Sequence, residues 1–159
     1  MLTEARVESR RDEMSTLNWS DVDWFVEDVF ARRLRHYVSE VARALGVGPE
    51  STMADPATPA SAYLALDGRV PGFPDRDLAL LWDERHGWSA AVETHSGEDL
   101  VIVSYVDPMH GLVPSPRVLA RFVAALRAGE HLGRADPSDL CGPDRRHLNN
   151  LLAAHYHES

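Results

Sequence analysis

Three short runs decide the fold: DLALLWD at residues 77–83, WSAAVET at 88–94 and DLVIVSY at 99–105. The connections between them are brief; the first ends in Gly87 and the second contains Ser96-Gly97. Apolar runs of this length, separated by glycine-containing turns, are typical of β-hairpins. The sequence therefore predicts three consecutive antiparallel strands.

A fourth strand is predicted upstream, at Ala60–Leu66, where it is stopped by the turn pair Asp67-Gly68. A loop at residues 69–76 leads from there into the strand at 77–83, whereas residues 46–61 are rich in proline and glycine and are predicted to form a loop. The expected core of the fold is thus an antiparallel meander of four strands.

The two faces of this meander are expected to differ, because side chains alternate along a strand. An antiparallel sheet usually packs one face against helices and leaves the other in water. The predicted helix-packed face holds Ala79, Leu81, Trp88, Ala90, Val92, Val101, Val103 and Tyr105. The predicted outer face holds Leu78, Leu80, Trp82, Ser89, Ala91, Glu93, Leu100, Ile102 and Ser104. The outer set is too apolar for plain solvated surface, so a partner should cover it, or else the chain's own third helix or N-terminal segment.

Helices are predicted before and after the meander along the chain. A long N-terminal helix should run from Asp21 to Leu45, with Ser20 as its N-cap, Trp19 and Trp24 as a hydrophobic staple, and Gly46 at its end. A second helix should run from a Ser115 cap to Ala128, and a short third helix should begin near Pro143 and bury Leu148, Leu151 and Leu152. The expected fold class is α+β, with a flexible tail at 1–18, one domain at 19–130 and a C-terminal extension with the short helix at 131–159.

Composition excludes several function classes. The chain of 159 residues carries 25 acidic and 16 basic residues, a net charge of −9, and every basic residue is an arginine. This charge has the wrong sign for nucleic-acid binding, and the absence of lysine excludes Schiff-base chemistry and a Walker A loop. The single cysteine, Cys141, cannot form an internal disulfide, and no apolar run is long enough for a membrane span. We expect a cytoplasmic protein that binds neither nucleic acid nor membrane.

A polar cluster is expected where the predicted hairpins bring the ends of neighbouring strands together. One edge of the sheet, near Glu93, should collect Asp75, Arg76, Asp77, His95, Glu98 and Asp99. Carboxylates with a histidine and an arginine suit a divalent cation or a small polar ligand. The same residues are also ordinary turn formers, so the sequence assigns no metal site here.

No common catalytic motif is present. The chain lacks a Gly-x-Ser-x-Gly elbow, a Gly-x-Gly-x-x-Gly loop and a His-Glu-x-x-His helix, and no catalytic residue or cofactor is predicted. The absence of these motifs favours a role without enzymatic activity.

The runs GFPDRDLALLWDE at 72–84, HGW at 86–88 and ETHSGEDL at 93–100 resemble a family of small actinobacterial proteins that contain a domain of unknown function. The similarity extends from about Tyr37 to Phe122, and it implies no activity, cofactor or catalytic residue. The order of helix, meander and helix is also similar to that of secretion-chaperone-like folds, by analogy of fold alone.

These observations predict a protein-interaction or regulatory module that meets a protein partner or a second copy of itself through the outer face of the sheet. The alternative is a domain or enzyme that binds a small ligand or a divalent metal around Asp75, Glu93 and His95. The candidate binding residues for the two hypotheses are Asp75, Arg76, Asp77, Leu80, Trp82, Glu93, His95, Asp99 and Ile102.

Overall fold

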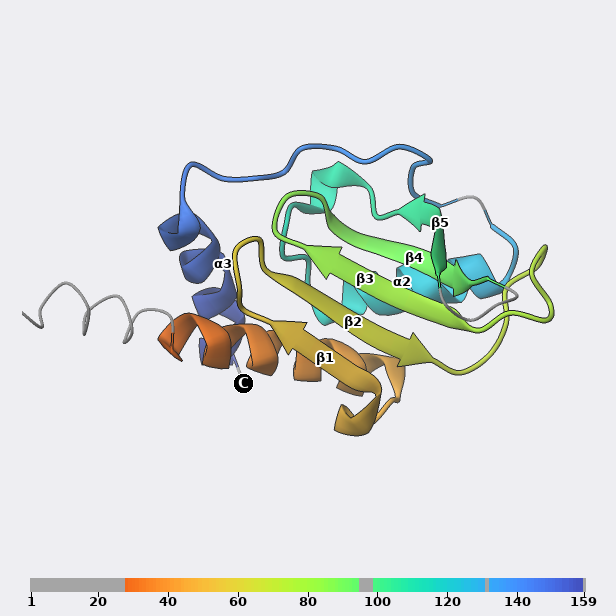
Figure 1. Cartoon of the computed structure of the whole chain (residues 1–159), viewed down its shortest axis with the longest axis horizontal. Coiled ribbons are helices and arrows are strands. Elements are labelled where there is room, and N and C mark those ends of the chain that lie inside the picture. Colours follow the sequence, from red (N-terminus) through yellow and green to blue (C-terminus); the bar gives the residue numbers. More distant parts are fainter. Residues whose placement is uncertain (1–27, 95–98, 131, 159) are drawn as a thin grey trace, which may run out of the picture.

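A five-stranded antiparallel sheet with the strand order β1-β2-β3-β4-β5 forms the centre of the protein (Figure 1). The structure is a computed structural model, and it describes residues 28–94, 99–130 and 132–158. The strands are β1 (Thr52–Asp55), β2 (Ser61–Leu66), β3 (Leu78–Asp83), β4 (Gly87–Glu93) and β5 (Leu100–Tyr105). The α+β class and the antiparallel meander are confirmed, but the prediction of four strands is wrong because β1 adds a fifth.

The fifth strand lies in a segment that the sequence predicts as loop. β1 has four residues and pairs with β2 through Thr52–Leu64 to Asp55–Ser61. It forms one edge of the sheet, and its burial alternates between intermediate and exposed. A strand this short and this exposed needs no apolar run, so its pairing with β2 leaves little trace in the sequence.

Three helices accompany the sheet. The first is described over residues 28–45 and ends at Gly46, whose φ of 76° gives the expected left-handed cap. Helix α2 (Pro116–Arg127) begins with the predicted Ser115 cap, whose side chain accepts the N–H of Val118. Helix α3 (Arg145–Glu158) is longer than expected, and short 3-10 turns occur at η1 (Pro49–Ser51) and η2 (Pro108–His110). The expected start of the first helix at Asp21, its Ser20 and tryptophan caps, and the tail at 1–18 lie outside the described residues.

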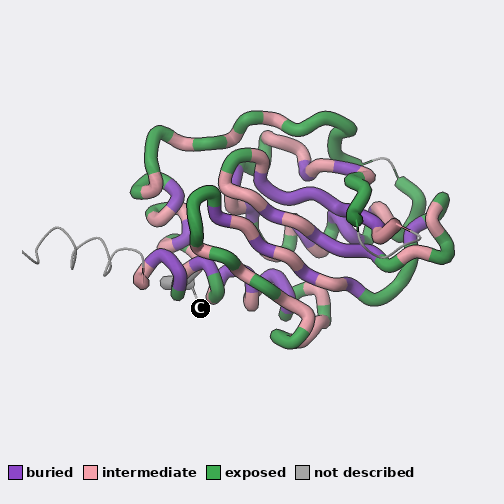
Figure 2. The backbone as a smooth tube through the Cα atoms, in the orientation of Figure 1, coloured by how far each residue is buried: buried purple, intermediate pink, exposed green. Residues whose placement is uncertain are grey.

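All three helices pack on one face of the sheet. Their buried side chains, such as Leu34, Leu119 and Leu152, share a single core with Leu80 of β3 and Ala90 of β4. Figure 1 looks onto the opposite face, with α2 and the first helix behind the strands, and Figure 2 shows the buried backbone concentrated in β3 and β4. Helix α3 therefore belongs to the core side and does not cover the outer face. The N-terminal segment, which the sequence offers as the other cover, lies outside the described residues.

The register of the central hairpin corrects the predicted faces. Leu78 pairs with Val92, Leu80 with Ala90 and Trp82 with Trp88. Cross-strand partners point to the same side, so Leu78, Leu80 and Trp82 lie on the helix-packed face and their placement on the outer face is wrong.

The reason for this error is the length of the turn. Asp83 pairs with Gly87, so the connection holds the three residues 84–86, and Gly87 takes a φ of 73°. An odd number of loop residues shifts the pairing by one and moves a whole strand to the other face. Ala79 and Leu81 point outward for the same reason.

A β-bulge corrects the last strand. The pairing of β4 with β5 shifts between Ala90 and Ala91, and Val103 is the extra residue. Ser104 therefore faces the helices, where its hydroxyl donates to the carbonyl of Leu132 at 2.9 Å. Tyr105 faces outward with Ser89, opposite to the prediction.

Beyond α2 the chain runs along the β5 side of the sheet and then reaches α3 (Figure 1). Arg134 and Tyr105 exchange two backbone hydrogen bonds of 2.7 and 2.8 Å. Further on, the N–H of Leu140 donates to the carbonyl of Arg85 at 2.7 Å. These contacts fasten residues 132–144 to the sheet.

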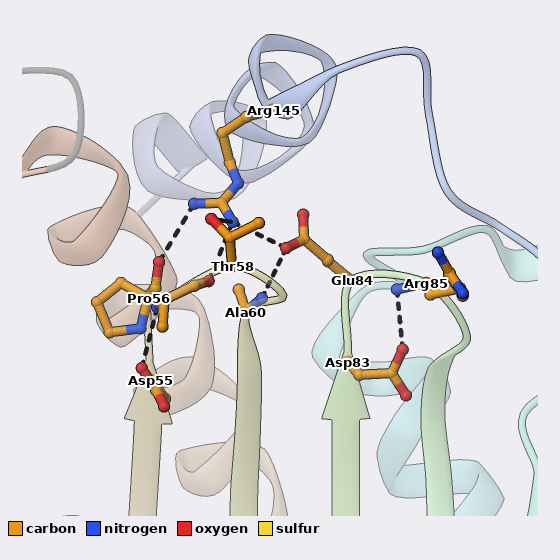
Figure 3. A network of polar contacts seen from close by, with 9 residues as sticks. Asp55, Pro56, Thr58, Ala60, Asp83, Glu84, Arg85 and Arg145 are labelled. Atoms are coloured by element: carbon orange, nitrogen blue, oxygen red, sulfur yellow. Dashed lines mark hydrogen bonds and ion pairs between the residues drawn. The ribbon is translucent and has the colours of Figure 1, made fainter. Parts of the chain in front are cut away.

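Arg145 joins the start of α3 to the turns at the end of the sheet (Figure 3). Its guanidinium donates to the carbonyls of Pro56 and Ala57 at 3.2 and 3.0 Å, to the hydroxyl of Thr58 at 3.2 Å, and to Glu84 Oε1 at 2.8 Å. A single side chain thus holds the β1–β2 turn, the β3–β4 turn and α3 together.

Candidate functional site

The outer face of the sheet is the candidate site. It is defined by the strand residues that alternate away from the helices in the observed register. These residues are Met53, Asp55, Ser61, Tyr63, Ala65, Ala79, Leu81, Asp83, Ser89, Ala91, Glu93, Leu100, Ile102 and Tyr105. None of the described helices packs against this face.

Small residues form the floor of the outer face. Ala79, Ser89 and Ala91 are each buried to within 4% of full burial although no described element lies over them. The larger side chains of Tyr63 and Leu81 lie beside this floor and are partly exposed. They shield the small residues from solvent. The result is a shallow, mainly apolar surface with raised sides.

A hollow of about 350 Å³ opens at the β1 side of this face. Met53, Tyr63 and Leu81 supply its apolar wall, whereas Asp55 and Asp83 supply its polar rim. Met53 is 67% exposed, and it stands in one cross-strand row with Tyr63 and Leu81. An apolar side chain of another molecule would fit between these residues.

The charge on this face is acidic. Among the outer-face residues the charged ones are Asp55, Asp83 and Glu93, and none is an arginine or a histidine. Burial raises the pKa of the Tyr63 phenol, and the nearby charges of Glu93 and Asp77 raise it further. The local potential is therefore negative.

Two of these carboxylates accept hydrogen bonds from backbone N–H groups of the adjoining turns. The Asp83 carboxylate accepts the N–H groups of Arg85 and His86, both at 2.8 Å, and lies 3.2 Å from the His86 ring nitrogen Nδ1. Asp55 accepts the N–H of Ala57 at 2.9 Å. Both carboxylates remain at the rim of the hollow.

The predicted polar cluster is found partly assembled at the other end of the face. The N–H of Glu93 donates to the carbonyl of Asp77 at 3.1 Å, and the N–H of Thr94 donates to that of Asp99 at 2.9 Å. Asp77 forms an ion pair with Arg69. The backbone thus brings Asp77, Glu93 and Asp99 to neighbouring strand ends, as the hairpin pattern predicts.

Asp75 and Arg76 lie in the turn before β3. Asp75 is exposed, and the guanidinium of Arg76 stands over the Phe73 ring at 5.8 Å from its centre. His95 and Glu98 lie outside the described residues. Within the described ranges, no three histidine, cysteine or acidic side chains come together as a metal site.

Two candidate residues lie on the wrong side of the sheet for partner binding. Leu80 and Trp82 are buried under the helices, and the Trp82 indole donates to the carbonyl of Leu112 at 2.9 Å. Ile102 does lie on the outer face and is exposed. In place of Leu80 and Trp82 the face presents Tyr63 and Leu81. The glycine at position 87 was the sequence signal for Leu81, because a three-residue hairpin turn favours a glycine with positive φ at its end, and Gly87 has such a φ.

A second, smaller hollow of about 230 Å³ lies between η2 and α2, with Met109, Phe122 and Leu132 as its apolar lining and His110 and Arg121 among its polar groups. In the part of the chain that the structure describes, no helix is both long and apolar enough to cross a membrane.

Comparison with known proteins gives one relationship. No curated protein and no solved structure matches the chain. A family model matches residues 37–125, more than half of the chain, and this segment contains the whole sheet, the outer face and most of α2. The chain therefore belongs to DUF6292, a family of unknown function.

Proposed function

We propose that the protein is an interaction module whose outer face binds a basic segment of a protein partner. The observation that carries this proposal is the combination, on one sheet face, of an acidic rim and an apolar floor that none of the described elements covers. Soluble proteins rarely leave a continuous apolar patch without a use, and interfaces combine an apolar centre with a polar rim.

Charge decides what kind of partner fits. The face offers carboxylates at Asp55, Asp83 and Glu93 and no basic strand residue, so an acidic partner would be repelled. A segment with arginine or lysine on both sides of a large apolar residue would place its charges on the rim and its apolar side chain in the hollow beside Met53. The preferred occupant is therefore a basic, partly apolar peptide segment.

A peptide-display selection tests the proposal. Immobilised protein should enrich peptides that carry basic residues around an aromatic or aliphatic one. The variant Leu81→Arg places a positive charge in the hollow and should weaken their binding at least tenfold. Leu132→Arg is the matched control, because it makes the same change at an exposed leucine away from the face and alters net charge equally.

The outcome is decisive in both directions. Enriched basic peptides that lose affinity for Leu81→Arg and keep it for Leu132→Arg support the proposal. Peptides that respond equally to the two variants report only the net charge of −9, and acidic or purely apolar consensus peptides would contradict the assigned chemistry.

A further inference from the structure

The exposed edge of β5 borders the outer face and is unusually apolar for an edge strand. Leu100, Val101 and Ile102 are 37%, 44% and 40% exposed, although all three are apolar and consecutive. Leu100 and Ile102 point to the outer side of the sheet, and Val101 points to the helix side. The edge is therefore apolar on both faces.

Edge strands normally carry devices that prevent pairing with another chain, such as charges, proline, bulges or a covering loop. The second half of β5 has two of them: the bulge at Val103 and the pairing of Tyr105 with Arg134. The first half has neither. Among the described residues, no backbone segment pairs with the open side of β5 at residues 100–102.

The backbone groups on this open side can be assigned from the ladder. Because the Asp99 carbonyl accepts from Thr94, Asp99 points toward β4. Inward and outward residues alternate in an antiparallel ladder, so Leu100 and Ile102 direct their N–H and C=O groups away from β4. The edge therefore offers one N–H donor and one C=O acceptor at Leu100 and the same two groups at Ile102.

We propose that a second copy of the chain pairs with this edge, strand β5 against strand β5, to form one continuous antiparallel sheet. The pattern is self-complementary under a two-fold axis. Leu100 would exchange both hydrogen bonds with Ile102 of the second copy, and Ile102 with Leu100 of the second copy. The two Val101 residues would then face each other on the axis as a pair without hydrogen bonds.

Self-pairing suits this edge better than binding of the basic partner of the outer face. The open stretch 100–102 carries no charge, and the acidic residue next to it, Asp99, is displaced from Asp99 of the second copy in this register. A short paired edge buries less than the roughly 1,200 Å² of a standard interface, so the dimer should dissociate in the micromolar to millimolar range. Since each copy carries a charge of −9, added salt should strengthen the dimer.

Sedimentation velocity over a range of protein concentrations is the first test. The wild type should show a monomer–dimer equilibrium, and Val101→Lys should shift it at least tenfold toward monomer by placing two like charges on the axis. Ile102→Pro removes one outward N–H without removing a bond to β4, whereas Ile102→Ala keeps that N–H. Proline should therefore abolish dimerisation while alanine only weakens it, with the far-UV circular dichroism of each variant showing that it folds.

Disulfide trapping tests the register independently of stability. With Cys141→Ser as background, Val101→Cys should cross-link into a dimer under mild oxidation, because Cβ atoms of a facing pair without hydrogen bonds are about 4.5–5.5 Å apart. Met53→Cys in the same background is the control, since Met53 is exposed but lies on the opposite edge strand.

A wild type that stays monomeric up to about 1 mM, the weakest affinity expected here, overturns the proposal. Cross-linking of the Met53→Cys variant without that of Val101→Cys also overturns it, because it would locate self-association at another surface. Leu81→Arg should leave the dimer intact, so failure of the edge pairing and failure of peptide binding at the outer face remain distinguishable.

Discussion

Replacement of Arg145 by alanine should lower the free energy of unfolding by about 3 kcal/mol. The side chain is 26% exposed and its partner Glu84 is 16% exposed, so the pair lies between a surface ion pair, worth up to about 1 kcal/mol, and a fully buried one, worth about 3–5 kcal/mol when broken. The charge-assisted bond to Glu84 accounts for about 1.5–3 kcal/mol of the loss.

Two further contacts add to this value. The guanidinium lies 4.2 Å from the centre of the Phe30 ring on the first helix, a cation–π contact worth roughly 0.5–2 kcal/mol. Glu84 keeps one compensating bond after the substitution, because its Oε1 also accepts the N–H of Ala60 at 2.6 Å. The expected total therefore stays near 3 kcal/mol rather than the full sum of the contacts.

Urea unfolding measures the effect. For a slope of about 2 kcal/mol/M, the midpoint should fall by roughly 1.5 M with the slope unchanged. Arg146→Ala is the matched control, because it removes the neighbouring arginine, which is exposed on the same helix turn, and should change stability by less than about 0.5 kcal/mol. Combining Arg145→Ala with Glu84→Gln should give a coupling of at least about 1 kcal/mol. Equal effects of the two arginine variants, or additivity in the double variant, would show that the network does not hold α3 in place.

Two other perturbations test the interior and the segment that follows α2. Burial raises the pKa of the Tyr37 phenol far above its ordinary value, so the folded state keeps this proton while the unfolded chain releases it above about pH 10; stability is intact below that pH and should fall by about 1.4 kcal/mol per pH unit above it. Tyr37→Phe should lower the urea midpoint at neutral pH but reduce the loss of stability above pH 10. If stability falls as steeply with pH in the variant as in the wild type, the loss belongs to other groups, of which Tyr63 is one. Gly133→Ala should destabilise by more than about 2 kcal/mol, because the new Cβ would overlap the carbonyl oxygen of Tyr105 at a φ of 99°. Gly111→Ala, at a φ of 77° with open space around it, gives the cost of the backbone conformation alone, and equal thermal shifts for the two variants would contradict the close approach.

The sequence predicts the meander well because its signal is local. Runs such as 77–83 and 99–105 carry apolar residues between glycine-containing turns, and the observed strands differ from these bounds by one residue. The Ser115 cap and the Gly46 stop are equally local and are both confirmed. Features that depend on a single turn or helix end can be predicted from the sequence.

The composition of the outer face could not be predicted in the same way, because one residue more or less in a turn or a strand changes which side chains face outward. A difference of one residue in the length of the turn at 84–86 exchanges Leu80 and Trp82 for Leu81 and Ala79. A bulge at Val103 then exchanges Ser104 for Tyr105 in the last strand. Alternation was predicted correctly within β3 and β4 and broken by the bulge in β5. The relation between strands is a tertiary property that apolar residues on both faces do not specify.

Apolar residues on both faces are also the reason why the exposure of β5 is unusual. A Leu-Val-Ile strand has apolar side chains on both faces, yet the helices bury only the inward residues of β2, β3 and β4. Val92 of β4 is fully buried, whereas its β5 partner Val101 is 44% exposed. β1 at the opposite edge is short and ends in Asp55, so it is suited to remain an edge. The two edges of the sheet thus differ: β1 is suited to solvent exposure, whereas β5 carries the apolar side chains that are typical of an inner strand.

Ionic strength separates the two surfaces that follow from this asymmetry. Binding of a basic segment at the acidic outer face gains from opposite charges and should weaken as salt rises, whereas pairing of two chains that each carry −9 is opposed by like charges and should strengthen. The two trends must have opposite signs if the outer face and the β5 edge have different occupants. If self-association weakens with salt instead, then the acids of one copy meet the arginines of another, and the edge pairing of uncharged residues 100–102 is not the contact that holds the dimer.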